Sequence, residues 1–335
     1  MSALLELRDL TIDYRSRRGL VPAVRGVNLT LEAGQTLGMA GESGCGKSTL
    51  AMSVLRLLPK TAVIGGEVLL DGEDVRTMSF GRLRAVRWAG ASVVFQGAMH
   101  ALNPVLRIGD QLAEPITLHG GAGAKSNSPA DVQRAVGELL ERVGLPRRHA
   151  KAYPHELSGG QKQRVMIAMA LACGPRLVIA DEPTTALDVM VQAQVLKLLG
   201  ELVSESGIGL MMISHDLSVL AQTCQRLAVM YAGRMVELGP SAQVMHQPAH
   251  PYSKALAAAF PTVGDPASRM APQGLPGDPP DPTNLPGGCP FHPRCPVSTV
   301  ECESTDVLLR QADPEHQAAC VRVPENVTET AGEPV

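Results

Sequence analysis

Nine consecutive residues, Gly41-Glu-Ser-Gly-Cys-Gly-Lys-Ser-Thr49, constrain the fold more than any other part of the chain. They match the pattern Gly-x4-Gly-Lys-Ser at every defined position. The apolar run 36–40 before them predicts a strand, and residues 47–58 after them predict a helix. In that order, glycines let backbone N–H groups turn inward around phosphate groups, and the helix adds its positive N-terminal end. The context favours a phosphate-binding loop in an α/β domain over a chance glycine-rich turn.

Each residue of this loop has an expected role. Lys47 should reach the β- and γ-phosphates of a nucleoside triphosphate, and the Ser48 hydroxyl should ligate Mg²⁺. The remaining phosphate contacts are expected from Gly41, Ser43, Gly44, Cys45, Gly46 and Thr49.

Two further apolar runs end in residues suited to hydrolysis. Leu177–Ala180 is followed by Asp181, a predicted Mg²⁺ ligand, and by Glu182, which is placed to orient or deprotonate the attacking water. Gly209–Ile213 precedes His215. Because strand ends of an open parallel sheet line one ligand crevice, we expect His215 at the γ-phosphate. A surface histidine and a purely structural Asp-Glu pair are the alternatives.

Two residues outside these strands complete the expected nucleotide site. Gln96 follows the short apolar run 92–95 and is predicted to contact Mg²⁺ and the attacking water. Tyr14, 27 residues before Gly41, is one of the few aromatic residues of the chain. It is a candidate for stacking on adenine, and an ordinary strand tyrosine is the alternative.

A second motif, Leu157-Ser-Gly-Gly-Gln161, has no use in the chain's own nucleotide site. Ser158 is suited to cap a helix over 161–171. The two glycines after it expose backbone N–H groups to an anion. Such a surface is suited to close over a nucleotide that another subunit holds.

Taken in order, these motifs resemble those of ATP-binding-cassette ATPases over roughly residues 4–260. The resemblance implies a phosphate-loop NTPase of the α/β class, with a RecA-like core, an antiparallel β subdomain and a helical subdomain. It also implies a head-to-tail dimer that holds two ATP molecules between its subunits. Contacts with the partner's ATP would come from Ser158, Gly159, Gly160 and Gln161, and Asp188 would bridge the two sites.

The loop 95–104 and the chain after residue 277 resemble the ATPases of oligopeptide, dipeptide and nickel importers. That resemblance implies a second, different ATPase subunit, two transmembrane permease subunits and, indirectly, an extracytoplasmic binding protein. The chain would work at the cytoplasmic face of the cell membrane. A nickel or other small-solute importer is the alternative, and a non-transport cassette ATPase acting on ribosomes or DNA is a more distant one. A phosphate-loop kinase does not explain the motif 157–161.

Bulk properties agree with this organisation. The 335 residues carry a net charge of −3, which does not indicate nucleic acid as a partner. No run approaches the roughly 18 apolar residues of a membrane-spanning helix. We expect a nucleotide-binding domain over 1–260, with its helical subdomain at about 97–173. Most of the 26 prolines lie at or after position 240, which predicts a Pro-rich linker and a small Cys-rich C-terminal appendage over 261–335.

The C-terminal appendage holds four cysteines, Cys289, Cys295, Cys302 and Cys320, in the spacing Cys-x5-Cys-x6-Cys-x17-Cys. In a cytosolic chain such crowding indicates a metal more than disulfides. Zinc sites favour closer pairs, so four thiolates around an iron–sulfur cluster fit the spacing better. The tail is also similar to a family tail that holds a 4Fe-4S centre. Zinc, or cysteines without metal, are the alternatives.

Overall fold

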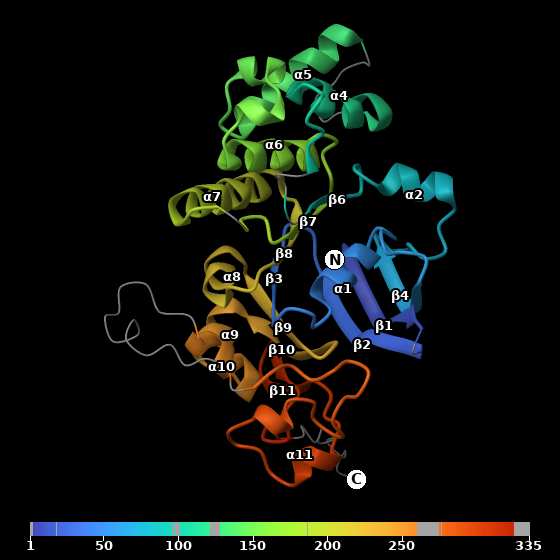
Figure 1. Ribbon diagram of the computed structural model, residues 1–335, viewed down its shortest axis with the longest axis vertical. Helices are drawn as coiled ribbons and strands as arrows, with labels where there is room; N and C mark the ends of the chain where they lie inside the picture. The colour runs from blue at the N-terminus through green and yellow to red at the C-terminus, as the bar shows by residue number, and fades with distance from the viewer. Residues whose placement is uncertain are drawn as a thin grey trace, which may run out of the picture.

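The computed structural model describes residues 3–17, 19–95, 97, 101–120, 128–185, 187–259, 275 and 277–324. Its strands form two sheets, with helices around the larger one (Figure 1). The predicted Gln96, most of the loop 96–100 and most of the linker 261–276 lie outside the described residues. Among the described helices, none combines the length and apolar character that a bilayer span requires.

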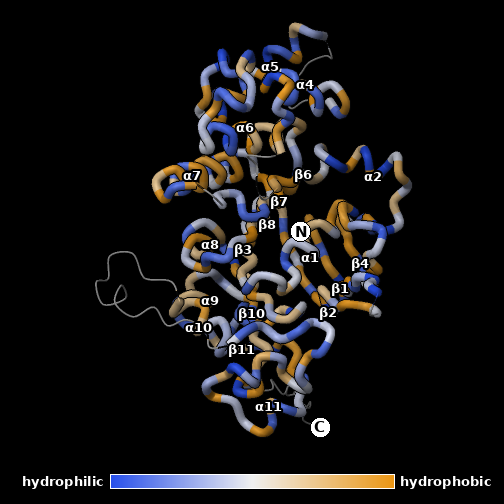
Figure 2. The backbone as a smooth tube through the Cα atoms, viewed as in Figure 1, coloured by the Kyte–Doolittle hydropathy of each residue, from blue (hydrophilic) through white to orange (hydrophobic). Residues whose placement is uncertain are grey.

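The larger sheet has eight strands in the order β11-β12-β10-β9-β3-β8-β7-β6. Five of them, β9, β3, β8, β7 and β6, run parallel. The apolar runs that predicted central strands are fully buried, as sheets covered on both faces require. Figure 2 shows this hydrophobic centre at β7 and β8. The strands are β3 (Thr36–Ala40), β6 (Ala91–Val94), β7 (Leu177–Asp181), β8 (Gly209–Ile213), β9 (Arg226–Tyr231), β10 (Arg234–Pro240), β11 (Arg310–Asp313) and β12 (His316–Ala318).

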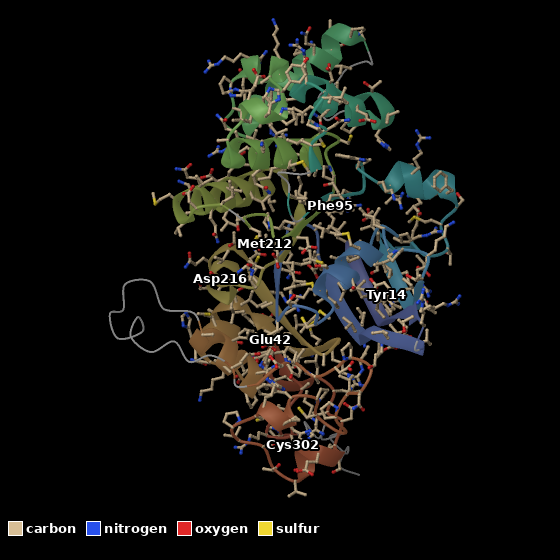
Figure 3. All side chains as sticks on the ribbon, viewed as in Figure 1. Tyr14, Glu42, Phe95, Met212, Asp216 and Cys302 are labelled. Carbon is tan, nitrogen blue, oxygen red and sulfur yellow. The ribbon has the colours of Figure 1, made fainter. Side chains whose placement is uncertain are left out.

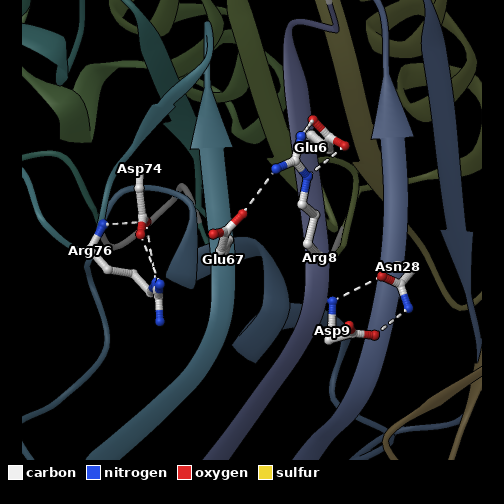
Figure 4. Close-up of polar contacts among 7 residues, drawn as sticks. All are labelled: Glu6, Arg8, Asp9, Asn28, Glu67, Asp74 and Arg76. Atoms are coloured by element: carbon white, nitrogen blue, oxygen red, sulfur yellow. Dashed lines mark hydrogen bonds and ion pairs between the residues drawn. The ribbon is translucent and has the colours of Figure 1, made fainter.

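The smaller sheet is antiparallel, with the order β2-β1-β4-β5, and has polar contacts on its exposed side (Figure 4). Arg8 lies between the carboxylates of Glu6 and Glu67. Asp9 adopts a left-handed φ of 45° where the register shifts, and the Asn28 side chain bonds both its N–H and its carboxylate. The amide thereby stabilises the bulge. The strands are β1 (Leu5–Ser16), β2 (Gly19–Leu31), β4 (Ala62–Leu70) and β5 (Glu73–Asp74).

A helical layer, placed between β6 and β7 in the chain, lies at one end of the molecule (Figure 1). It contains α4 (Ile108–His119), α5 (Pro129–Arg142) and α6 (Gly159–Leu171). The described chain between β6 and β7 is therefore mainly helical. The other helices of the described residues are α1 (Lys47–Ser53), α2 (Phe80–Val86), α7 (Val189–Ser206), α8 (Leu217–Thr223), α9 (Ser241–His246), α10 (Pro251–Ala259) and α11 (Glu301–Ser304), with short 3-10 turns at Arg147–Lys151, Pro154–Glu156 and His292–Arg294.

Two features differ from the expectations. The helix expected over 47–58 ends at Ser53, and Arg56 turns the chain with a φ of 50°. The C-terminal appendage also extends the large sheet, because β12 pairs antiparallel with β10 and β11 pairs with β12. Each of these strands is three or four residues long, too short for hydrophobic periodicity to predict.

Candidate functional site: the phosphate loop and its surroundings

The phosphate loop connects β3 to α1 and needs glycine for steric reasons. Gly46 has a φ of 106°, and a Cβ there would collide with the backbone carbonyl oxygen of Ala23. A Cβ on Gly41, at a φ of 147°, would collide with the carbonyl of Met230. The two glycines therefore allow β2 and β9 to approach the loop closely.

Lys47 is buried at the base of this loop. Its ammonium donates hydrogen bonds to the carbonyl oxygens of Gly41 (2.7 Å) and Glu42 (2.9 Å). The loop backbone thus satisfies the charged group, as a buried ammonium requires.

The predicted Mg²⁺ ligands come together from distant parts of the chain. The Ser48 hydroxyl at the start of α1 donates to Oδ1 of Asp181 at the end of β7, at 3.2 Å. Burial raises the pKa of the Asp181 carboxyl, and the Ser48 hydrogen bond opposes that shift. A hydroxyl and a carboxylate are oxygen ligands of the kind Mg²⁺ prefers. The donor set therefore fits Mg²⁺.

Glu182 and His215 lie at the ends of neighbouring strands. Glu182 has a left-handed φ of 47°, and its N–H donates to the carbonyl of Ile213 (3.0 Å). Its carboxylate accepts the Thr185 hydroxyl at 2.9 Å and lies 3.8 Å from Nδ1 of His215. Strained backbone conformations that neighbouring strands hold in place cluster at functional sites, where they fix the direction of a side chain.

Tyr14 also reaches the nucleotide site, through its hydroxyl. That oxygen lies 3.1 Å from Oγ1 of Thr49 in α1. The contact places the tyrosine ring beside the phosphate loop, where the sequence predicted an adenine contact. Stacking itself remains a prediction.

The second motif is built as a helix N-terminus. Ser158 and Gln161 form a reciprocal capping box at the start of α6, with N–O distances of 2.9 Å and 3.4 Å. Asp188 caps α7 through the N–H of Val191 (3.0 Å). A Cβ on Gly160 would meet the Val191 side chain. The two caps are therefore neighbours, and no hydrogen bond or ion pair in the described chain joins residues 158–161 to residues 41–49.

The four cysteines of the C-terminal appendage are free thiols. The Cys289 N–H donates to the Cys302 carbonyl (2.9 Å). Burial raises the pKa of Cys289, and the other three cysteines raise it further. Within the described residues, however, no three His, Cys, Asp or Glu side chains are grouped to hold a metal ion. The side-chain positions do not support the metal centre predicted at Cys289, Cys295, Cys302 and Cys320.

Sequence reasoning missed one part of the site. Arg294, in the C-terminal appendage, makes a bidentate ion pair with Glu42 of the phosphate loop. Glu42 occupies an unspecified position of the Gly-x4-Gly-Lys-Ser pattern, and only a three-dimensional structure could reveal its partner.

An apolar groove of about 270 Å³ lies between the large sheet and α6. Phe95, directly before the predicted Gln96, is 42 % exposed beside it. Other lining residues include Leu57, Trp88, Ala101, Met166 and Met169.

Comparisons with known proteins agree with this architecture. Residues 24–185 match a family model described as ABC transporter, and residues 236–302 match one described as oligopeptide/dipeptide transporter, C-terminal region. The chain is 44 % identical over 309 residues to the oligopeptide transport ATP-binding protein OppD of Salmonella typhimurium, covering 92 % of this chain and 90 % of that protein. The OppD of Escherichia coli is 44 % identical over 322 residues, covering 96 % and 93 %. A putative peptide import ATP-binding protein of Brucella ovis is 42 % identical over 333 residues, covering 95 % and 97 %.

Solved structures show the same fold. A dimeric post-hydrolysis state of the ATP-binding cassette MJ0796, bound to ADP and Pi, aligns with a TM-score of 0.62 at 29 % identity, covering 71 % of this chain and 98 % of that one. The structure of cbiO1 from Clostridium perfringens aligns with the same TM-score at 27 % identity, covering 74 % and 92 %.

Proposed function

This chain belongs to the ATP-binding proteins of the oligopeptide/dipeptide ABC transporter family, and we propose that its ATP hydrolysis powers the import of small peptides through a membrane permease. The proposal rests on one observation, which is that this chain combines an ATP-binding cassette with a C-terminal region of the peptide-transporter type. A phosphate loop with its predicted catalytic residues lies in the cassette, and a C-terminal region of the oligopeptide/dipeptide type follows it.

In the proposed reaction, Lys47 and the N–H groups of the phosphate loop bind the β- and γ-phosphates. Ser48 and Asp181 would hold Mg²⁺ bound with ATP, and the metal would supply positive charge opposite the phosphates. Glu182 orients the attacking water and accepts its proton, which typically accelerates a reaction by ~10²–10⁴-fold. His215, 3.8 Å from Glu182, contacts the γ-phosphate. The predicted Gln96 would complete the site from the loop after β6.

The dimer follows from the second motif. Residues 158–161 present a capped helix N-terminus that makes no polar contact with the chain's own phosphate loop among the described residues. In a head-to-tail dimer, Ser158, Gly159, Gly160 and Gln161 would lie over the partner's γ-phosphate, and Asp188 would bridge the sites. ATP would then close the dimer, and hydrolysis would release it. The likeness to a dimeric cassette supports this arrangement.

The permease would dock in the apolar groove beside Phe95. The exposed Phe95 ring and the neighbouring Trp88, Met166 and Met169 offer apolar contacts for a helix of the permease. The groove adjoins the loop that should carry Gln96, so closure of the dimer at the ATP site would change the position of the docked permease helix.

In this proposal, residues 1–260 form the ATP-hydrolysing domain, and residues 261–335 form a linker and the C-terminal appendage. Substrate choice would belong to the permease and an extracytoplasmic binding protein, so a nickel or other small-solute importer is the second candidate.

We also propose a metal centre, a 4Fe-4S cluster before zinc, in the C-terminal appendage. Four free thiols in one small appendage support it, together with the backbone hydrogen bond between Cys289 and Cys302, and a shared metal would require the side chains to turn toward one another. Anaerobic purification followed by a visible spectrum and an iron assay tests it. A coloured protein with about four irons per chain is expected, as for a cluster held by four thiolates. A colourless, iron-free protein would refute the cluster.

The transport proposal is tested by affinity capture of the tagged full chain from detergent-solubilised membranes. Two permease subunits and a second ATPase should be recovered. Phe95→Asp, which places a charge in the docking groove, should lose the permease but keep ATP binding. Recovery of ribosomes without permease subunits would refute the proposal.

A further inference from the structure

A residue of the phosphate loop is held by the C-terminal appendage. Arg294 donates from Nη1 to Oε2 of Glu42 at 2.7 Å and from Nη2 to Oε1 at 2.9 Å, across 252 positions of sequence. Arg294 also donates to the Tyr231 hydroxyl at 3.3 Å. Figure 3 shows Glu42 between the large sheet and the C-terminal segment that carries Cys302. Bidentate pairs of this kind combine strength with fixed geometry.

This contact is mostly shielded from water. The Arg294 side chain is 7 % exposed and that of Glu42 is 23 % exposed. Phe291, three residues before Arg294, is buried edge-on against the rings of Tyr231 and Tyr252, with centroids 5.3 Å apart in each case. The aromatic group fixes where the guanidinium lies. When a largely buried ion pair loses one partner, the remaining uncompensated charge is strongly destabilising.

Glu42 is fixed on its backbone side as well. Its N–H donates to the Tyr252 hydroxyl at 2.8 Å, and its carbonyl accepts the Lys47 ammonium at 2.9 Å. Glu42 therefore contacts both Tyr252, against which Phe291 of the appendage packs, and Lys47, which is expected to bind phosphate. A movement of Glu42 would be transmitted directly to Lys47.

Without its Arg294 partner, the charge of Glu42 would oppose phosphate binding. A carboxylate in a loop that receives a polyanionic triphosphate would repel it, and low solvent access would weaken screening. We propose that Arg294 is a positioning residue for ATP: it neutralises the Glu42 carboxylate and holds the loop open for phosphate, so that the C-terminal appendage is part of the working ATP site. This inference rests on the proposed role of residues 41–49.

The test uses Mg·ATP titrations of the full chain with four variants. Arg294→Ala leaves the carboxylate unpaired and should raise the Kd for ATP about tenfold, which corresponds to about 1.4 kcal/mol. Glu42→Gln removes the repelling charge and should bind ATP as well as the wild type or better. The double variant should recover wild-type affinity within about twofold. Arg322→Ala is the matched control, because this arginine of the same appendage contacts the carbonyl of Val297 and no residue of the phosphate loop in the described structure.

The outcomes separate the possible roles. If the ion pair only fastened the appendage, Glu42→Gln would weaken ATP binding as much as Arg294→Ala, and the double variant would not recover. Either of these results, or unchanged affinity in Arg294→Ala, would overturn the inference. A wild-type chain that fails to bind ATP would instead refute the proposed function. Thermal unfolding of each variant shows whether a loss of binding reflects a loss of folding.

Discussion

His250 should make the stability of this protein depend on pH in a predictable direction. Its ring is buried between the cassette and the C-terminal appendage, 6.0 Å from the Phe291 ring. Nδ1 accepts the Tyr252 N–H at 3.0 Å, and a hydrogen bond joins the ring to the backbone of Ala319. Burial lowers the pKa of His250 from 6.5 to about 4, and the bond to Ala319 opposes this. The folded state therefore keeps the ring neutral.

The sign and size of the effect follow from linkage. Between pH 6.5 and pH 4 the unfolded chain binds a proton at His250 that the folded chain does not, so stability falls as pH falls. With these two pKa values, lowering the pH from 7.5 to 5 removes about 2 kcal/mol from the free energy of unfolding. The Glu237 carboxylate faces the same region, accepting the backbone N–H of His250 (2.9 Å) and the ring of His316 (2.7 Å). Glu237 and His316 are both retained in the His250→Asn variant, which serves as the reference.

Urea unfolding of the full chain at pH 7.5 and pH 5 measures this effect. His250→Asn keeps an acceptor where Nδ1 lies and cannot titrate, so it serves as the reference. Contributions of other titrating groups cancel when the two proteins are compared. The wild type should lose about 2 kcal/mol more than His250→Asn over this interval. Equal losses in the two proteins would show that His250 is charged in the folded state, and would refute the reasoning.

Three further predictions concern the ATP site. Glu182→Gln should still bind ATP and should trap the dimer, while hydrolysis falls by ~10²–10⁴-fold; a normal rate of phosphate release would rule out Glu182 as the base. Gly46→Ala should weaken ATP binding by at least about tenfold, because its Cβ would collide with the Ala23 carbonyl at a left-handed φ; equilibrium dialysis showing wild-type affinity would contradict this. Tyr14→Ala should raise the KM for ATP about tenfold through lost stacking, whereas Tyr14→Phe, which loses only the hydroxyl contact with Thr49, should change it little; equal effects of the two variants would argue against stacking.

Local sequence was enough to predict the cassette. The phosphate loop, β7 and β8 are each specified by a short run whose periodicity and glycine content leave few alternatives. The capping box of Ser158 is equally local. These elements therefore appear where the sequence indicated.

The contacts of the C-terminal appendage could not be predicted in the same way. The pair Glu42–Arg294 joins residues 252 positions apart, and the pairing of β12 with β10 depends on three residues of a strand. α1 also ends at Ser53, and in the turn that follows Arg56 donates to the distant Met78 carbonyl at 2.8 Å. Contacts between residues far apart in the sequence, which no local pattern encodes, accompany all three features.

The proposed function requires that ATP hydrolysis by this chain drives peptide import. The most direct measurement is uptake of a radiolabelled oligopeptide by cells in which this chain has been deleted and then restored. Uptake should be lost on deletion, return with the wild-type chain, and stay absent with Glu182→Gln expressed at the same level. Uptake that persists after deletion, or that Glu182→Gln restores in full, would contradict the claim.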